Sequence, residues 1–222
     1  VLHFLHIGKT GGTQIERLLE EIFPGQSAVR YVVHKHTMPM RKLPRDAEYF
    51  FSVRKPPWRF RSAFYDRKRF GRDGNAPWSP EEEKFFSHFD HASDVAEVLF
   101  DDSMDGRIAR EGVRSAEHMR SSQVDWFFPH GSFLLSRPPV AIIRQEHLWQ
   151  DFLVLTQKLS IDSTGVRRPR TAVNATDYSG APEFTEKGLT NLNTWYSNDV
   201  MFYEEVCEFI EEHSPRRGQE TR

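Results

Sequence analysis

Short, largely apolar runs alternate with amphipathic stretches along most of the chain. Four runs predict buried strands: Val1–Ile7, Ala28–His34, Ala47–Arg54 and Val140–Arg144. Elsewhere apolar positions recur at the three- and four-residue spacing of helices. The helices predicted in this way span residues 13–22, 59–70, 80–89, 92–100 and 146–159, with one or two closing helices over 185–212. The apolar positions of residues 104–126 show little periodicity, so no helix or strand is predicted there.

Strands that alternate with helices predict an α/β fold in which helices flank a central parallel sheet. The chain has 222 residues, enough for one domain with a substantial core. No repeat or linker divides it, so we expect a single domain over residues 1–222.

The first strand runs into a glycine-rich turn and then a helix. Thr13 and Glu16 have the spacing of a capping box, which predicts that the helix starts at Thr13. A turn of this kind presents free backbone N–H groups and the positive end of the helix dipole to an anion. Lys9 adds a positive charge, and Thr10 and Thr13 add hydroxyl groups. Lys9, Thr10, Gly11, Gly12 and Thr13 are therefore predicted to hold a phosphate or sulfate group.

This turn only partly matches the nucleoside-triphosphate loop, G-x-x-x-x-G-K-[ST]. Gly8, Lys9 and Thr10 supply the end of that pattern, but its first glycine would fall at His3, inside the predicted strand. No convincing magnesium-binding aspartate follows a strand. A loop this short suits one terminal anionic group better than a β/γ-phosphate pair with Mg²⁺.

A second anion site is predicted at the end of the third strand. Arg54 closes that strand, and Ser62 follows eight residues later in a predicted helix. A guanidinium group and a hydroxyl together suit a phosphate. Two anion sites at neighbouring strand ends favour a nucleoside that carries phosphates at two places.

These two motifs resemble those of the sulfotransferase superfamily. Lys9–Thr13 after a first strand and Arg54–Tyr65 after a third are similar to the carbohydrate sulfotransferase branch, which holds the heparan uronyl 2-O and chondroitin types and bacterial relatives. Further similarity lies in three segments: Val33–Pro44, Val140–Leu155 and Thr194–Val206.

The resemblance implies a P-loop-like sulfotransferase fold and the cofactor 3′-phosphoadenosine 5′-phosphosulfate (PAPS), with 3′-phosphoadenosine 5′-phosphate (PAP) as product. It implies that Lys9–Thr13 hold the 5′-phosphosulfate and that Arg54 and Ser62 hold the 3′-phosphate. It also places a catalytic histidine at His36.

Sulfuryl transfer to a hydroxyl needs a base and a stabiliser of negative charge. Lys9 is the expected stabiliser of the leaving oxygen. His34 and His36 are the candidate bases, because residues two apart on an extended segment point the same way. His36 is the first choice and His34 the second. No third metal ligand stands out near them, so no metal is predicted.

The expected function is transfer of the sulfuryl group of PAPS to a hydroxyl, in line, with a carbohydrate glycan or glycoside as acceptor. The alternatives are a P-loop kinase or NTPase and a non-catalytic nucleotide- or glycan-binding module. Binding alone needs no base, so Lys9 and His36 together favour an enzyme. The acceptor, the position sulfated and the oligomeric state stay open.

The composition of the chain limits its possible partners and the cellular compartment in which we expect it. A formal net charge of −2 predicts no nucleic-acid partner, and no apolar run approaches the roughly 20 residues of a membrane span. Cys207 is the only cysteine and cannot form an internal disulfide, which fits a reducing compartment. We expect a bacterial cytoplasmic enzyme. Because the chain starts at Val1, a Golgi luminal domain trimmed of its anchor is the alternative.

Overall fold

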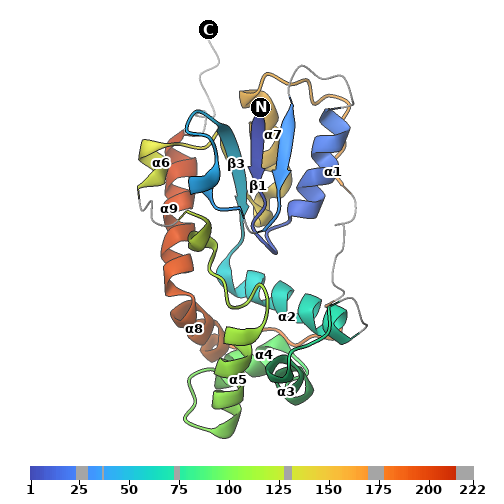
Figure 1. Cartoon of the computed structure of the whole chain (residues 1–222), viewed down its shortest axis with the longest axis vertical. Coiled ribbons are helices and arrows are strands. Elements are labelled where there is room, and N and C mark those ends of the chain that lie inside the picture. Colours follow the sequence, from blue (N-terminus) through green and yellow to red (C-terminus); the bar gives the residue numbers. More distant parts are fainter. Residues whose placement is uncertain (24–29, 37, 73–75, 128–131, 170–177, 214–222) are drawn as a thin grey trace.

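Four parallel strands form one sheet whose order in space differs from that in the chain. The computed structural model describes residues 1–23, 30–36, 38–72, 76–127, 132–169 and 178–213. The strands are β1 (Leu2–Leu5), β2 (Tyr31–His34), β3 (Glu48–Val53) and β4 (Ala141–Arg144). They lie in the order β2-β1-β3-β4, and every neighbouring pair is parallel (Figure 1). The predicted α/β fold with a central parallel sheet is confirmed.

The strand order reverses between β1 and β3. From β1 the chain crosses to β2 on one side, and from β3 it crosses to β4 on the other. Leu5 is in register with both His34 and Phe51, so the strands reach their carboxyl ends close together. In open parallel sheets, ligands bind outside the carboxyl ends at such a reversal. The segments that follow β1 and β3 are therefore where a site is expected.

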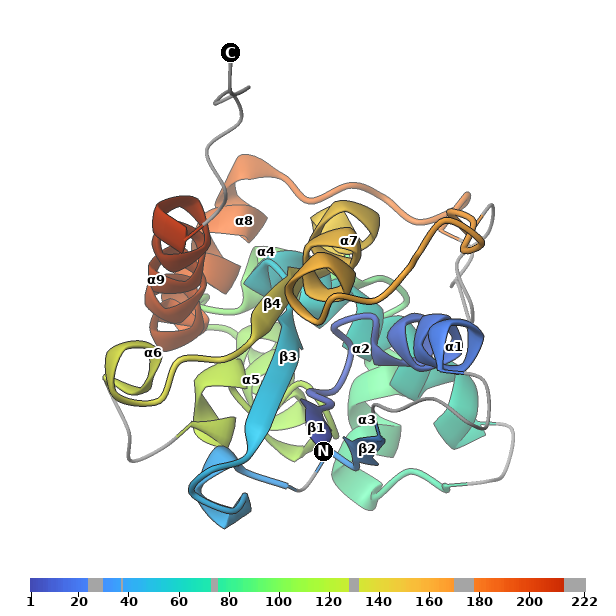
Figure 2. The ribbon, with the colours of Figure 1, turned by 90° about the horizontal axis from the view of Figure 1, so that it is seen from above.

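Helices cover both faces of the sheet (Figure 2). On one face lie α1 (Gly12–Ile22) and α7 (Leu148–Lys158), and on the other lie α6 (Phe133–Ser136) and α9 (Ser197–His213). Successive strand residues point to opposite faces, and in β1, β3 and β4 most residues of both sets are buried. This double burial is why the strand sequences are nearly continuous apolar runs.

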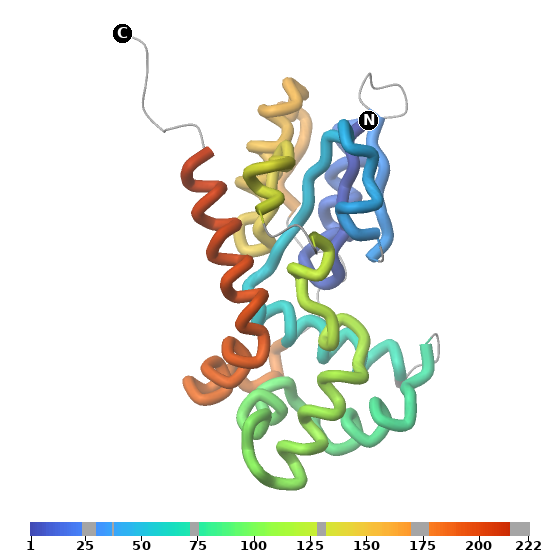
Figure 3. The backbone as a smooth tube through the Cα atoms, turned by 60° about the vertical axis from the view of Figure 1, so that its left-hand side comes forward, coloured from blue at the N-terminus to red at the C-terminus, as the bar shows by residue number. Residues whose placement is uncertain are grey.

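A layer of helices lies beyond the carboxyl ends of the strands, with its own apolar core (Figures 1 and 3). Its members are α2 (Pro56–Arg72), α3 (Pro80–His88), α4 (Ala92–Val98), α5 (Met104–Ser115) and α8 (Glu186–Trp195). The predicted start of α3 is confirmed, because Ser79 and Glu82 form a reciprocal capping box. The two closing helices are α8 and α9.

Helices α1 and α2 both begin before their predicted starts. α1 begins at Gly12 with Gly11 as its N-cap, and no side chain caps it. The predicted capping box fails because the Glu16 carboxylate contacts His6 instead. α2 begins at Pro56, three residues before the predicted start, since proline is well accommodated in a first helical turn.

Helix α5 lies in the segment for which the sequence predicted nothing. Its buried face includes Gly106, Ala109 and Gly112, small residues that add little apolar signal. A Cβ atom on Gly112 would lie 2.0 Å from the Phe85 ring, so glycine is needed for α3 to approach.

Three 3₁₀ helices join the larger elements: η1 (Met40–Lys42), η2 (Gln123–Trp126) and η3 (Gln145–His147). Of the predicted second strand, β2 covers residues 31–34, while 28 and 29 lie outside the described residues. Among the described residues, no helix combines the length and the apolarity needed to cross a lipid bilayer.

Candidate functional site

The loop after β1 turns through two left-handed residues. Lys9 has φ of 67° and Gly11 has φ of 89°. Glycine adopts this conformation freely, whereas a residue with a Cβ does so at a cost of about 1–2 kcal/mol. The first hydrogen bonds of α1 run from the N–H groups of Gln14 and Ile15 to Gly11 O. Within the described residues, the amides of 9–13 donate to no backbone carbonyl, so they can meet an anion at the α1 N-terminus.

Thr10 fastens this loop to the sheet. Its side chain is fully buried, and its hydroxyl donates to Ile7 O at 2.8 Å. The Ser52 hydroxyl on β3 lies 2.6 Å from the Thr10 hydroxyl and must donate to it, because the Thr10 proton is already committed. Thr10 can therefore offer a ligand its backbone N–H but not its hydroxyl proton, contrary to the sequence prediction. The Thr13 side chain, by contrast, is exposed.

Lys9 reaches from the loop to α2. Its Nζ lies 2.7 Å from Asp66 Oδ1, and each side chain is about one-fifth exposed. Asp66 follows Ser62 by four residues, so the two share a face of α2 about one turn apart. Ser62 is 8% exposed. The ion pair therefore brings the loop against the α2 face that carries Ser62.

Arg54 follows β3 directly and is held through its backbone. Its N–H donates to Gln123 Oε1 at 2.9 Å, and its carbonyl accepts from Gln123 Nε2 at 2.8 Å. Burial lowers the pKa of its guanidinium, and the nearby Tyr178 opposes that shift. Arg54 Nε is buried and has no hydrogen-bond partner among the described residues. A buried, unpartnered N–H at this place is suited to an anionic ligand.

His36 has a defined tautomer. Its Nδ1 lies 3.0 Å from His6 O, and a carbonyl can only accept, so Nδ1 carries the hydrogen. In the neutral ring, Nε2 therefore keeps its lone pair and can accept a proton. The ring packs edge-on between His6 at 4.4 Å and His118 at 5.1 Å, centroid to centroid.

His34 is engaged elsewhere. Its Nε2 lies 2.8 Å from Nδ1 of His3 on the adjacent strand, and the two rings are stacked with centroids 5.1 Å apart. The structure does not bring His34 and His36 together at one point, as the sequence alternation predicted. β2 ends at His34 and the chain turns at His36, so the two-residue period no longer applies.

Two further histidines line the loop, and sequence reasoning missed both. His6 Nδ1 lies 2.7 Å from Glu16 Oε1. Burial is the main cause that lowers the pKa of His6 to about 4, so at pH 7 this contact is a hydrogen bond from a neutral ring. Burial, aided by the neighbouring His36 and Lys9, lowers the pKa of His118 to about 3. Lys9 thus carries its charge beside two neutral rings.

The glycines of the loop make room for these rings. A Cβ atom on Gly8 would lie 2.5 Å from His118 Nδ1, and one on Gly12 would lie 1.9 Å from His6 Nε2. The sequence explained these glycines by backbone turns and anion binding alone. His6 could have been found from its position beside the loop, but His118 lies in the aperiodic segment and had no signal.

The described histidines around the loop are not grouped as metal ligands. In the described part of the chain, no group of three or more His, Cys, Asp or Glu side chains is arranged to hold a metal ion. The Nδ1 hydrogens of His6 and His36 are directed to Glu16 and a carbonyl, respectively. The cluster is instead a packed set of rings around the loop.

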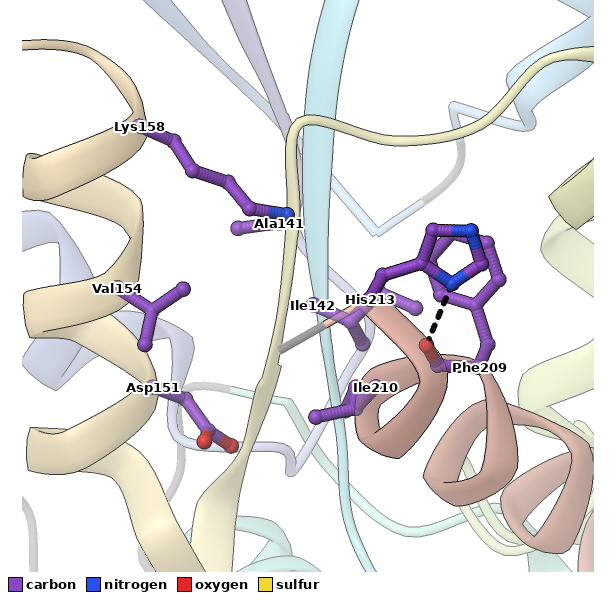
Figure 4. Close-up of a pocket in the computed structure, with 8 residues that line it drawn as sticks. All are labelled: Ala141, Ile142, Asp151, Val154, Lys158, Phe209, Ile210 and His213. Atoms are coloured by element: carbon purple, nitrogen blue, oxygen red, sulfur yellow. Dashed lines mark hydrogen bonds between the residues drawn. The ribbon is translucent and has the colours of Figure 1, made fainter. Parts of the chain in front are cut away.

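A separate small cavity lies between β4, α7 and α9 (Figure 4). Its volume is about 40 Å³, comparable to one or two water molecules and too small for a nucleotide. It is lined by Ala141, Ile142, Asp151, Val154, Lys158, Phe209, Ile210 and His213. None of these residues belongs to the predicted site.

The site that the geometry assembles lies at the carboxyl ends of β1 and β3 and on the first turns of α2. The loop amides and Lys9 lie there with Arg54 and Ser62, and His36 packs against His6, which precedes Lys9 in the same segment. Compared with protein-family models, with curated proteins and with solved structures, the chain matches none.

Proposed function

We propose that the chain is a PAPS-dependent sulfotransferase that acts on a hydroxyl group. The observation that supports this most is the pairing of two anion-binding elements at the reversal of strand order: the loop after β1, with Lys9, and Arg54 after β3. A cofactor with a 5′-phosphosulfate and a 3′-phosphate needs two such elements on neighbouring strand ends.

The residues present fit this cofactor. The amides of residues 9–13, which donate to no backbone carbonyl among the described residues, and Lys9 would hold the 5′ group, as a helix N-terminus holds anions. Arg54, whose buried Nε has no hydrogen-bond partner in the described part of the chain, and Ser62 would hold the 3′-phosphate. Two cations and free N–H groups supply donors for both anions without a metal.

In this proposal PAPS supplies an activated sulfuryl group. His36 Nε2 takes the proton of the acceptor hydroxyl as that oxygen bonds to sulfur and the sulfur–oxygen bond to the 5′-phosphate breaks. Lys9 stabilises the negative charge that develops on the leaving oxygen. His34 takes no part as base, because its Nε2 faces His3. The acceptor class, a carbohydrate glycan or glycoside, rests on the sequence resemblance.

Calorimetric titration with PAP, and with ATP in the presence and absence of Mg²⁺, tests the proposal on wild type and Arg54→Ala. We expect PAP to bind without metal, ATP to bind poorly, and Arg54→Ala to weaken PAP binding about 10- to 100-fold, the range for a lost charge-assisted hydrogen bond. Arg45→Ala is the matched control, because this exposed arginine precedes the amino end of the same strand. Tighter binding of ATP with Mg²⁺ would refute the proposal and favour a nucleoside-triphosphate enzyme.

Turnover separates an enzyme from a binding module. With PAPS and a panel of glycoside acceptors, Lys9→Ala and His36→Gln should each lose most activity, and His36→Gln should keep its affinity for PAP. Full turnover by both variants would overturn the assigned roles.

A further inference from the structure

A segment from late in the chain lies along the first half of α2, beside Arg54. Arg61 of α2 is 8% exposed and holds this segment through several contacts. Its Nη1 donates to both carboxylate oxygens of Glu183 at 2.9 and 3.0 Å, and its Nη2 donates to Ala181 O at 3.4 Å. The segment that contains residues 178–184 is therefore anchored on the helix that carries Ser62.

The ring of Tyr178 is held on two sides. The Arg61 guanidinium lies over it, with Cζ 4.7 Å from the ring centroid. Tyr65, one turn further along α2, packs edge-on against it with centroids 5.6 Å apart. A cation over the ring face and an aromatic ring at its edge both stabilise this position. The same tyrosine interacts with Arg54, whose pKa it raises against the effect of burial.

We infer that Tyr178 is a specificity-determining residue, whose phenol joins Arg54 in binding the second phosphate of the nucleotide. The inference rests on the proposed function, which makes Arg54 a phosphate ligand. A phenol both accepts and donates, so the Tyr178 hydroxyl beside Arg54 can donate its hydrogen to a phosphate oxygen. Hydrogen bonds from hydroxyl groups to charged oxygens are short and strong.

PAP and a nucleotide without a 3′-phosphate differ in the group that Tyr178 would bind. PAP has a 3′-phosphate to accept the phenol hydrogen, and adenosine 5′-phosphate (AMP) has none. Tyr178→Phe keeps the ring between Arg61 and Tyr65 and removes only the hydroxyl. Tyr178→Phe should therefore weaken the binding of PAP and leave the binding of AMP unchanged. A general loosening of the segment would weaken the binding of both nucleotides.

The test is calorimetric titration of wild type, Tyr178→Phe and Tyr65→Phe with PAP and with AMP. Tyr65→Phe is the matched control, because its hydroxyl lies 3.3 Å from His91 Nδ1 instead of meeting Arg54. We expect Tyr178→Phe to bind PAP about 10-fold more weakly, with AMP unchanged, and Tyr65→Phe to change neither. In an Arg54→Gln background, the loss caused by Tyr178→Phe should shrink, since both residues bind one phosphate.

Different failures have different meanings. If wild type prefers PAP to AMP and Tyr178→Phe keeps that preference in full, Tyr178 has no role in specificity while the proposed function stands. Equal weakening of PAP and AMP would also overturn the inference, because it would assign Tyr178 a structural role. If wild type shows no preference for PAP, the proposed function and the inference fall together.

Discussion

His118 should make the folded chain sensitive to mild acid, and His118→Asn should relieve that sensitivity. The ring is partly buried and lies against Gly8 and His36, near Lys9. The folded chain keeps it neutral, because its pKa falls from 6.5 to about 3. The unfolded chain takes up a proton near pH 6.5, so acid favours the unfolded state between those two values.

The magnitude follows from the two pKa values. One titrating group changes the free energy of unfolding by about 1.4 kcal/mol per pH unit while only the unfolded chain binds the proton. Between pH 7 and pH 4.5, His118 should therefore lower the stability of wild type by about 2.5 kcal/mol. For a chain of this size that corresponds to roughly 5–10 °C in melting temperature.

Asparagine is the substitution of choice because His118 has φ of 64°, a conformation that asparagine tolerates. The variant loses packing at every pH, so the informative quantity is the difference between its melting temperatures at pH 7 and pH 4.5. That difference should be about 5–10 °C smaller than in wild type. His147→Asn is the control, since its side chain is exposed in the folded chain. Equal acid sensitivity in wild type and His118→Asn would refute the reasoning.

Two more predictions concern the loop. Gly12→Ala would place a Cβ atom against the His6 ring, so it should lower the free energy of unfolding by about 1–3 kcal/mol in a denaturant titration. Gly165→Ala is the control, because no atom lies within 4 Å of its Cβ position, and it should leave the free energy of unfolding unchanged. Lys9 pairs with the Asp66 carboxylate and must break this ion pair before it can bind an anion. Asp66→Asn should therefore bind PAP several-fold more tightly than wild type in a calorimetric titration. Weaker binding would show instead that Asp66 positions the lysine.

Much of the fold was predictable because strands that are buried on both faces of a parallel sheet have nearly continuous apolar sequences. β1, β3 and β4 are apolar runs, and α3 starts at a capping box that the sequence displays. Helix α5 was not predictable, since its buried face depends on Gly106 and Gly112, which carry no apolar signal.

The candidate site was predictable where its residues adjoin strand ends. Lys9 lies in the short loop after β1 and Arg54 directly follows β3, so their places depend mainly on which strands are neighbours. Asp66, His118 and Tyr178 come from a helix and two segments whose positions are set by tertiary packing. No local pattern identifies such residues, because what brings them to the site is the docking of distant segments.

The two halves of the proposed mechanism depend on different anchors and can fail separately. Arg54 is positioned by two hydrogen bonds to Gln123, whereas His36 is positioned by the carbonyl of His6. A protein that binds PAP through Arg54 but turns over without His36 would keep the nucleotide assignment and lose the base. Loss of PAP binding only when Lys9 is changed would locate the nucleotide at the loop and remove Arg54 from the site. Gln123 holds Arg54 and the His6 carbonyl holds His36, so the two anchors share no residue. Each outcome therefore identifies which of the two assignments is wrong.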